Sequence, residues 1–152
     1  MLKLVNMDQS SFDNYICGAI EKVAKEFVQS GICKEEEGVD YANKVFKQHL
    51  PKGLATDNQF LFNVINELNE VVGMIWYGVN KPTEAFISDF IIDENYRGKG
   101  YGKETMKLVE DHARNNGIKK ITLHVFGHNK QAINLYEKLG YQTFSMHMAK
   151  EL

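Results

Sequence analysis

Residues 95–103 read NYRGKGYGK, and this loop decides how the second half of the chain is interpreted. Gly98, Gly100 and Gly102 lie between a β-branched run that predicts a strand and an apolar pattern that predicts a helix. Glycine lets backbone N–H groups approach a ligand closely. The start of a helix adds unpaired N–H donors and a positive dipole end, which favour an anion. The composition therefore predicts a pyrophosphate-binding loop. It also supplies three basic side chains: Arg97, Lys99 and Lys103.

Two other phosphate-binding loops are disfavoured by spacing. A Walker A loop needs G-x-x-x-x-G-K-[ST], and no segment of the chain has this spacing. A dinucleotide fingerprint needs G-x-G-x-x-G and an acidic residue about twenty positions later. The loop has G-x-G-x-G instead, and residues 118–125 contain no acid. A nicotinamide cofactor is therefore not expected.

The elements on both sides of the loop alternate between strand and helix. A strand over Glu84–Asp93 precedes it, and a helix follows from Gly102 until Gly117. The remaining residues predict a strand, a helix and a last strand: Lys120–Phe126, Asn129–Leu139 and Tyr141–Lys150.

The first half predicts one strand, two helices and two more strands. The first helix is capped by Asp8 or Ser10 and ended by Gly31. The other elements are expected at Leu2–Asn6, Lys34–Leu50, Phe60–Ile65 and Val71–Val79. The whole order is β-α-α-β-β-β-α-β-α-β. This order predicts an α/β fold with a mixed sheet, in which a strand–helix–strand crossover joins two parallel strands.

Composition excludes several classes of protein. The 152 residues match one domain, and 18 basic against 20 acidic residues give a net charge of −2, which disfavours a nucleic-acid partner. Two cysteines are too few for a disulfide scaffold, so both are expected as thiols in a cytoplasmic protein. The longest run of apolar residues and glycine, residues 71–79, is about half of what a membrane span needs, and the amino terminus has no signal peptide.

Two motifs together resemble the GNAT superfamily of acetyl-CoA-dependent N-acetyltransferases. The pattern R-x-x-G-x-G at Arg97, Gly100 and Gly102 is similar to its coenzyme A pyrophosphate loop. Residues 128–142, HNKQAINLYEKLGYQ, are similar to its signature N-x-x-A-x-x-L-Y-E-K-x-G-[FY]. The two motifs occur in the expected order, with one strand and one helix between them.

The resemblance implies a single N-acetyltransferase domain over residues 1–152. Residues 1–83 would form the acceptor side and residues 84–152 the acetyl-CoA-binding half. The implied fold has a mostly antiparallel sheet with one parallel strand pair around the cofactor cleft, flanked by about four helices. The implied reaction transfers acetyl from acetyl-CoA to an amine of a small molecule or a protein, without a metal, and a homodimer through the sheet edge is common in the superfamily.

The resemblance also assigns cofactor contacts residue by residue. Backbone groups of the strand before the loop would hold the pantetheine and the thioester, and the loop itself would hold the pyrophosphate. Asn129 would reach the pantetheine arm, and Tyr136 would lie beside the sulfur. The strand and loop positions are Phe90, Ile91, Ile92, Arg97, Gly98, Lys99, Gly100, Tyr101, Gly102 and Lys103.

Tyr136 occupies the position of the superfamily's general acid. Coenzyme A leaves as a thiolate that must gain a proton, and a phenol, with a reference pKa near 10, can supply it to a thiol of about 8.5. The alternative interpretation is that Tyr136 only packs in an amphipathic helix. It follows Asn129 by two helical turns, so both would lie on one face.

The general base is less clearly marked in the sequence. Many superfamily members have a Glu where this chain has Ser88. Asp89 is the nearest carboxylate, but alternation along a strand would direct it away from the side of Ser88, and it can equally be a structural partner. His124 could relay a proton or be a structural histidine. His124 and His128 are four residues apart without a third ligand, so no metal is expected.

Other functions remain as alternatives. A non-enzymatic coenzyme A-binding sensor or interaction domain would explain the missing Glu, and a flavin- or nucleotide-binding oxidoreductase is a weaker alternative. The acceptor remains open among polyamines, aminoglycosides, amino acids and protein amino groups. The acidic residues 35–37 could attract a cationic amine, although a solvated helix amino terminus explains them equally simply.

Overall fold

The computed structural model describes residues 1–152. The strands are β1 Lys3–Asn6, β2 Gln59–Ile65, β3 Val71–Lys81, β4 Glu84–Ile92 and β5 Lys120–Leu123. The helices are α1 Gln9–Gln29, α2 Gly38–His49, α3 Tyr101–Asn115 and α4 Lys130–Lys138. Three short 3₁₀ turns lie at Glu35–Glu37, Gly53–Ala55 and Glu94–Tyr96. No helix is both long and apolar enough to cross a membrane.

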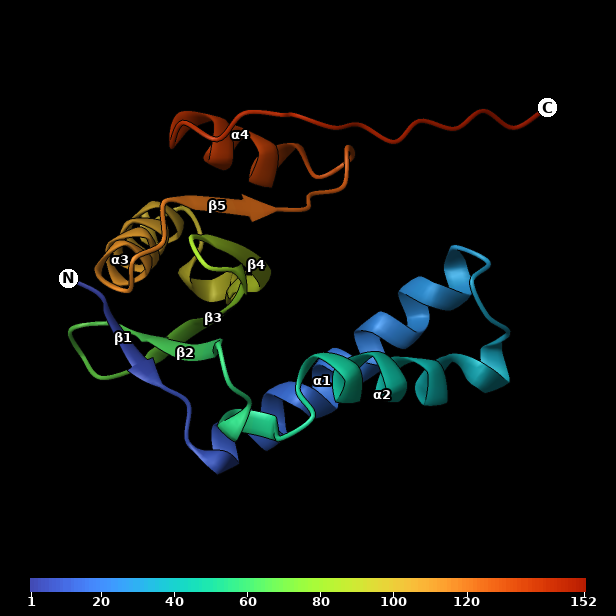
Figure 1. Ribbon diagram of the computed structural model, residues 1–152, viewed down its shortest axis with the longest axis horizontal. Coiled ribbons are helices and arrows are strands. Elements are labelled where there is room, and N and C mark those ends of the chain that lie inside the picture. Colours follow the sequence, from blue (N-terminus) through green and yellow to red (C-terminus); the bar gives the residue numbers. More distant parts are fainter.

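The five strands form one mixed sheet in the order β1-β2-β3-β4-β5 (Figure 1). The first four strands pair antiparallel, and β4 and β5 pair parallel through the α3 crossover. The predicted α/β class, with a mostly antiparallel sheet, one parallel pair and four helices, is confirmed.

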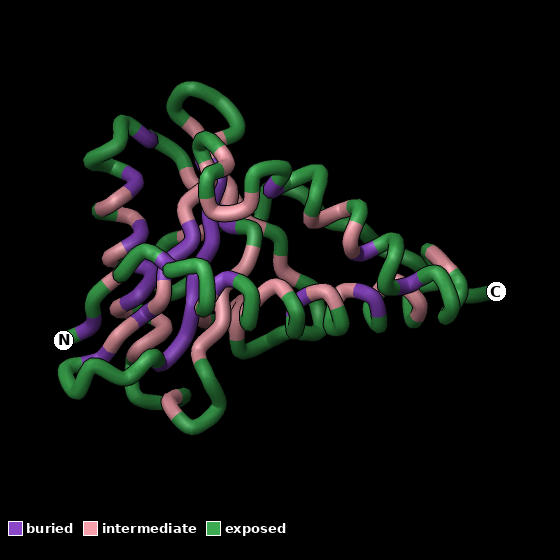
Figure 2. Tube along the Cα trace, turned by 90° about the horizontal axis from the view of Figure 1, so that it is seen from below, coloured by how far each residue is buried: buried purple, intermediate pink, exposed green.

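Two hydrophobic cores lie on opposite faces of this sheet, since neighbouring residues of a strand point to opposite sides. On one face, Met106 and Val109 of α3 pack against Ile75 and Tyr77 of β3. On the other face, Phe12 of α1 joins a core with residues of β2 and β3. Figure 2 shows the buried residues concentrated along the strands, while the far parts of α1 and α2 are mostly exposed. The α1–α2 pair therefore extends beyond the sheet as a projecting hairpin.

Local signals in the sequence set the helix ends. Asp8 caps α1, because its side chain accepts a hydrogen bond of 2.7 Å from the N–H of Ser11. Gly31, with φ +74°, follows α1, and Gly117, with φ +81°, follows α3. A left-handed glycine at this position ends a helix without strain. The α2 helix begins at Gly38, after a 3₁₀ turn, rather than at the predicted Lys34.

Strand β4 separates from β5 halfway along its length. The parallel pairing stops at Ile87 of β4 and Leu123 of β5, while β4 continues beside β3 to Ile92. An irregularity coincides with this point: Trp76 is opposite Asp89 and Tyr77 is opposite Ile87, which leaves Ser88 as an extra, exposed residue. Because a bulge interrupts strict alternation, alternation alone does not decide how the side chains of Ser88 and Asp89 point relative to each other. Residues 88–92 thus present an edge that no strand of the chain pairs.

The predicted last strand, Tyr141–Lys150, is wrong. Residues 142–152 form no strand and leave α4 as an extended segment (Figure 1). Their alternating apolar residues are typical of a strand, but a strand also needs a neighbour for its backbone hydrogen bonds. This segment pairs with no strand of the sheet, although β5 at the edge has an unpaired side. The strand β5 is also shorter than predicted, ending at Leu123 instead of Phe126.

Gly73 gives a test of the β3–β4 contact. A Cβ atom at this position would lie 2.2 Å from the carbonyl oxygen of Ile91 and 3.1 Å from the Cα of Ile92. Since both neighbours are backbone atoms, we expect Gly73→Ala to lower the free energy of unfolding by about 1–3 kcal/mol, the usual cost of overpacking. Urea denaturation measures this change. Gly18→Ala in α1, with open space around the Cβ, should instead stabilise by about 0.5–1 kcal/mol, and equal effects would contradict the close contact.

Candidate functional site

The glycine loop and the start of α3 form an anion-binding geometry. Gly98 has φ +76° and Gly100, the N-cap of α3, has φ +81°. A Cβ at either glycine would meet nothing within 4 Å, so open space lies in front of the backbone. No side chain caps α3. Its first N–H groups and the positive dipole end are therefore free for a ligand.

Gly102 has a different role from the other two glycines. A Cβ at Gly102 would lie 3.2 Å from Leu135 Cδ2 and 4.0 Å from Phe90 Cζ. The first turn of α3 therefore packs closely against both α4 and β4. Two glycines shape the loop, and the third allows the loop to sit against the helix that carries Tyr136.

The basic residues of the loop differ in how firmly they are held. Arg97 Nε donates a 2.9 Å hydrogen bond to the carbonyl oxygen of Ile92, and its guanidinium lies 3.7 Å from Glu94. Arg97 thus fastens the loop to the end of β4. Lys99 lies with Nζ 5.3 Å from the ring centroid of Tyr96, and Lys103 is exposed on α3. The two lysines place positive charge beside the open backbone, whereas Arg97 mainly fixes its position.

The predicted pantetheine contacts lie along the opening between β4 and β5. Phe90, Ile91 and Ile92 pair with β3 but have no partner on the β5 side. In an antiparallel strand, alternate N–H and C=O groups point away from the paired neighbour. The Phe90 N–H and the Ile92 C=O are already bonded to Asp89 and Arg97, and the remaining outward groups of this edge are open to a ligand. Asn129 is the N-cap of α4, and its side chain accepts a 3.2 Å hydrogen bond from the N–H of Ala132. Only the amide oxygen of Asn129 takes part in capping, so its NH₂ group can donate to a ligand.

Asp89 lies where β4 separates from β5, and two tyrosines are coupled to it. Tyr15 of α1 donates a 2.7 Å hydrogen bond from Oη to Asp89 Oδ2, and the N–H of Phe90 donates to Oδ1 at 2.9 Å. The negative charge of Asp89 also reaches Tyr136 on α4, where it helps to raise the pKa of the phenol. Asp89 therefore contacts Tyr15 directly and acts on Tyr136 through its charge.

Burial controls the protonation of both tyrosines. Burial first, and the charge of Asp89 second, raise the pKa of Tyr136 above its ordinary value near 10. The same two causes, together with the hydrogen bond, raise the pKa of Tyr15 further. Both phenols are therefore protonated at neutral pH. The Tyr15 hydroxyl donates its proton in the hydrogen bond to Asp89. For Tyr136, burial and the charge of Asp89 raise the pKa, and no hydrogen bond contributes.

His124 makes no hydrogen bond to Asp89, and it lines the same groove beside β5 as Tyr136 does. It follows the end of β5, is exposed, and contacts the ring of Phe126 with a centroid distance of 5.0 Å. His128 stacks on the same Phe126 ring, with a centroid distance of 5.5 Å. No group of three or more His, Cys, Asp or Glu side chains gathers in a way that could hold a metal ion.

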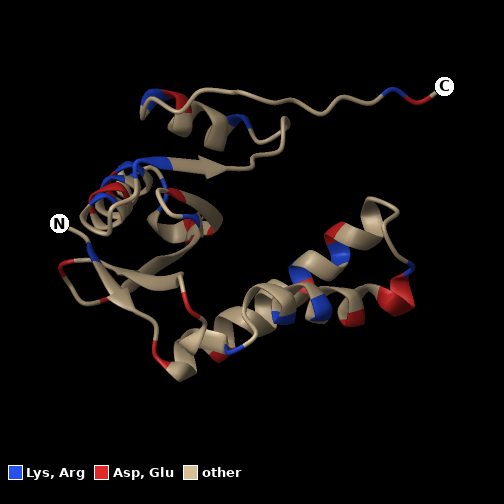
Figure 3. Ribbon diagram, in the orientation of Figure 1, with Lys and Arg blue, Asp and Glu red and all other residues tan.

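The acidic residues 35–37 lie at the far turn of the α1–α2 hairpin (Figure 3). Glu37 accepts a 3.0 Å hydrogen bond from the N–H of Lys34, as a carboxylate at a helix start commonly does. The geometry matches a solvated helix amino terminus. It places this charge away from Asp89 and Tyr136, which lie against the sheet.

Sequence reasoning missed Tyr15. It is 74 positions from Asp89, and in the sequence it reads as one more residue of an amphipathic helix. Only the packing of α1 on the sheet shows the contact. No local pattern could have identified it.

Comparison with known proteins agrees with this geometry. Residues 20–141 match the acetyltransferase (GNAT) family. The chain is 35% identical over 154 residues to the uncharacterized N-acetyltransferase YycN of Bacillus subtilis, covering 99% of both proteins. A crystal structure of YycN aligns with a TM-score of 0.90 over 100% of this chain and 99% of that one.

Two further matches, one protein and one solved structure, name a substrate or a ligand. A spermine/spermidine N(1)-acetyltransferase of Bacillus subtilis is 37% identical over 81 residues, 48% of this chain and 53% of that protein. The structure of AAC(6')-Iy with the bisubstrate analog CoA-S-monomethyl-acetylneamine has 12% identity and a TM-score of 0.63, covering 100% of this chain and 98% of that one. The second likeness shows the fold alone. With the family match across most of its length, this chain belongs to the acetyltransferase (GNAT) family.

Proposed function

We propose that this chain transfers acetyl from acetyl-CoA to a primary amine by direct attack of the amine on the thioester in a ternary complex. The observation that carries the proposal is that Asp89, at the opening between β4 and β5, is held by Tyr15 and acts through its charge on Tyr136. This arrangement puts a carboxylate near enough to a protonated phenol for its charge to act on that phenol. A proton acceptor and a proton donor are what acyl transfer to an amine requires.

The residues of the loop fit the pyrophosphate of coenzyme A. The backbone of Gly98 and Gly100 is open to a ligand, and the start of α3 carries uncapped N–H groups. Lys99 and Lys103 add charge of the correct sign. The free edge of β4 at residues 90–92 would hold the pantetheine, with the Asn129 amide as a further donor. Acetyl-CoA supplies the activated acetyl group.

Tyr136 is proposed as the proton donor to the departing thiolate. Its hydroxyl keeps its proton, because burial and Asp89 raise its pKa. It projects from α4, the helix that Leu135 holds against Gly102 of the loop. The contact between Gly102 and Leu135 therefore holds the proton donor at a set distance from the pyrophosphate site. Catalysis requires such fixed positions of the reacting groups.

Asp89 is proposed as the proton acceptor for the attacking amine, directly or through water. Tyr15 and the N–H of Phe90 each occupy one carboxylate oxygen and fix the orientation of the group. Each oxygen has further lone pairs available for an ammonium group or a water molecule. The carboxylate thus supplies, from the next position of the strand, the proton acceptor that Ser88 cannot provide.

Asp89→Asn tests this role. We expect kcat/KM to fall by about 10²- to 10⁴-fold, the usual contribution of general acid–base catalysis. The acidic limb of the kcat/KM profile should also flatten. The same kinetic measurement on His124→Ala tests the other group that could accept the proton. If the acidic limb follows the pKa of each acceptor amine and stays unaltered in the Asp89 variant, Asp89 is not the base.

An acetyl-transfer screen tests the proposed reaction itself. Thiol release from acetyl-CoA is measured with polyamines, aminoglycosides, amino acids and lysine peptides, which are the open acceptor classes. Turnover with at least one amine is the expected result. Tight binding of acetyl-CoA without turnover on any of them would favour a coenzyme A-binding sensor.

A further inference from the structure

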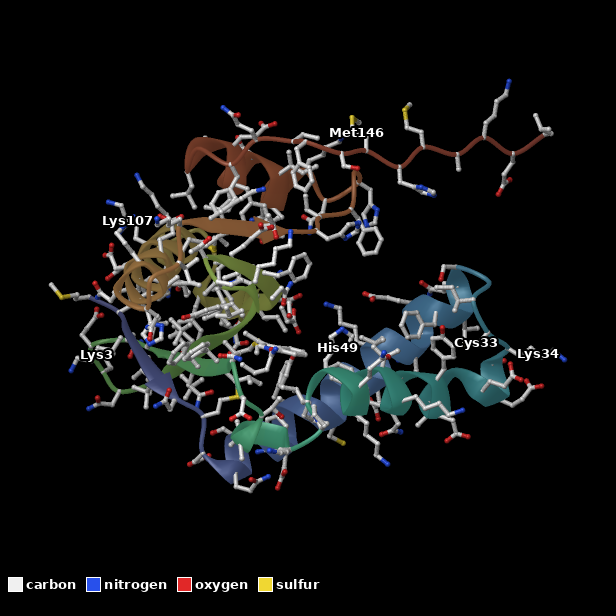
Figure 4. The ribbon with its side chains drawn as sticks, viewed as in Figure 1. Lys3, Cys33, Lys34, His49, Lys107 and Met146 are labelled. Atoms are coloured by element: carbon white, nitrogen blue, oxygen red, sulfur yellow. The ribbon has the colours of Figure 1, made fainter.

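His49, which the proposed reaction does not use, is the last residue of α2, where the α1–α2 hairpin meets the sheet (Figure 4). Its ring contacts the indole of Trp76 edge-on, with a centroid distance of 6.5 Å. Phe46, one turn earlier on α2, packs on the same indole at 6.2 Å. The indole is itself held, because Trp76 Nε1 donates a 2.6 Å hydrogen bond to Gln59 Oε1. An exposed histidine thus lies against a buried and fixed aromatic ring.

A hydrogen bond fixes which nitrogen of His49 carries the proton in the neutral ring. Nδ1 lies 2.8 Å from the carbonyl oxygen of Val45. A carbonyl oxygen only accepts, so Nδ1 is the donor in this bond, and Nε2 keeps its lone pair. This is the one hydrogen bond of the ring. Neutral His49 therefore offers a hydrogen-bond acceptor to a molecule from outside the chain.

His49 and Asp89 lie beside the same indole. Trp76 of β3 is directly opposite Asp89 of β4. Opposite residues of antiparallel strands share a face of the sheet, with Cβ atoms about 4.5–5.5 Å apart. Tyr15 of α1 reaches Asp89 from this face, on which its helix packs. The carboxylate of Asp89 and Nε2 of His49 are therefore neighbours of one indole on the same side of the sheet.

The end of α2 favours a bound group that donates hydrogen bonds. The last carbonyl groups of a helix have no partner within it, and Pro51 lacks the N–H that would bond to the carbonyl of Lys47. These carbonyls form the negative end of the helix dipole, which favours a cation. The Lys47 side chain, two residues before His49, lies about 200° around the helix from it. A substrate group beside His49 is therefore expected to be an ammonium or a hydroxyl rather than a carboxylate.

We propose that His49 selects the acceptor: its Nε2 accepts a hydrogen bond from a second donor group of the acceptor, while the reacting amine lies at Asp89. This role of His49 rests on the proposed function and narrows its substrate class. The acceptor is an amine that carries a further ammonium or hydroxyl group, as polyamines and aminoglycosides do. A simple monoamine lacks the second group, and an amino acid would bring its carboxylate to hydrogen-bond acceptors.

Steady-state kinetics with matched acceptors test this selection. Diaminobutane and aminobutanol carry a second donor group, and butylamine lacks it. In His49→Phe the ring still packs on Trp76 but has no nitrogen. We expect its kcat/KM to fall about tenfold for diaminobutane, the effect of one hydrogen bond to a charged group, and less for aminobutanol, whose hydroxyl is neutral. The loss should arise mainly in KM, and kcat/KM for butylamine should stay unchanged.

Two further variants show whether His49 acts through its nitrogen. His49→Gln keeps an acceptor oxygen and should recover part of the loss for diaminobutane. His147→Phe is the matched control, because it makes the same substitution at another exposed histidine, outside this face of the sheet, and it should keep the preference for diaminobutane. An equal loss for all three amines in His49→Phe would mean a structural role only and would overturn the proposal. An unaltered preference in His49→Phe would overturn it as well.

Calorimetry distinguishes the role of His49 from the proposed reaction. Diaminobutane and butylamine are titrated separately into the protein saturated with coenzyme A. We expect tighter binding of diaminobutane, and we expect His49→Phe to abolish the difference. With this result, a failure to transfer acetyl would contradict the proposed reaction and not the role of His49. Equal affinity of the unaltered chain for both amines, or binding of neither, would overturn the role of His49 and leave the reaction itself intact.

Discussion

Gly100→Asp is expected to weaken acetyl-CoA binding by at least about 100-fold. Gly100 has φ +81°, is the N-cap of α3, and has open space where a Cβ would lie. An aspartate would put a side chain and a negative charge where the pyrophosphate approaches the backbone. Loss of two charge-assisted hydrogen bonds, each about 1.5–3 kcal/mol, corresponds to about 10²- to 10⁴-fold in affinity. Isothermal titration calorimetry with acetyl-CoA measures this loss.

Gly117→Asp is the matched control for this substitution. Gly117 has the same φ of +81°, also has no atom within 4 Å of the place where a Cβ would lie, and follows the opposite end of α3. The two variants therefore share the backbone strain and the added charge, and differ only in which end of the helix they affect. Near-normal affinity in Gly117→Asp is expected. If both variants bind alike after their folding has been verified, the loop does not hold the pyrophosphate.

The parts of the site that the sequence predicted are those set by local chemistry. The glycine loop depends on residues within nine positions, and left-handed φ angles at Gly98 and Gly100 are a property of glycine itself. The Asn129 cap and the α4 helix are likewise local. The order of strands and helices followed from periodicity, which reports which face of an element is buried.

The parts that the sequence did not predict depend on contacts between distant segments. The hydrogen bond between Tyr15 and Asp89 needs α1 to cross the sheet at one particular place. The bulge at Ser88 depends on how β4 pairs with β3, so alternation along the strand could not set the direction of Asp89. Residues 142–152 have the pattern of a strand, but a pattern specifies which face is apolar and not which edge the strand joins.

Tyr136→Phe is expected to lower kcat by about 100-fold while KM for acetyl-CoA stays within a few-fold. The phenol is needed mainly in the transition state, when the thiolate leaves, so its loss affects kcat rather than cofactor binding. The ring still packs against Tyr141, with a centroid distance of 5.8 Å, so the fold should survive. Tyr141→Phe is the control, since that hydroxyl donates to Glu110 and not toward Asp89. Steady-state kinetics, with chemistry verified as rate-limiting, measure both variants; an unaltered kcat in Tyr136→Phe would assign the proton to another donor.

The charge of Asp89 connects this prediction with the proton acceptor. A negative neighbour disfavours the phenolate, which is why Asp89 helps to raise the pKa of Tyr136. Asp89→Asn removes that charge and keeps an oxygen for the Tyr15 hydroxyl, so the pKa of Tyr136 should move down toward its ordinary value near 10. Ultraviolet titration of Asp89→Asn, with Asp89→Asn plus Tyr136→Phe as the blank, measures this pKa. An unchanged pKa would mean that the charge of Asp89 does not act on Tyr136. A lowered pKa would show that the carboxylate proposed to accept the proton of the amine also helps to keep the proton on the phenol.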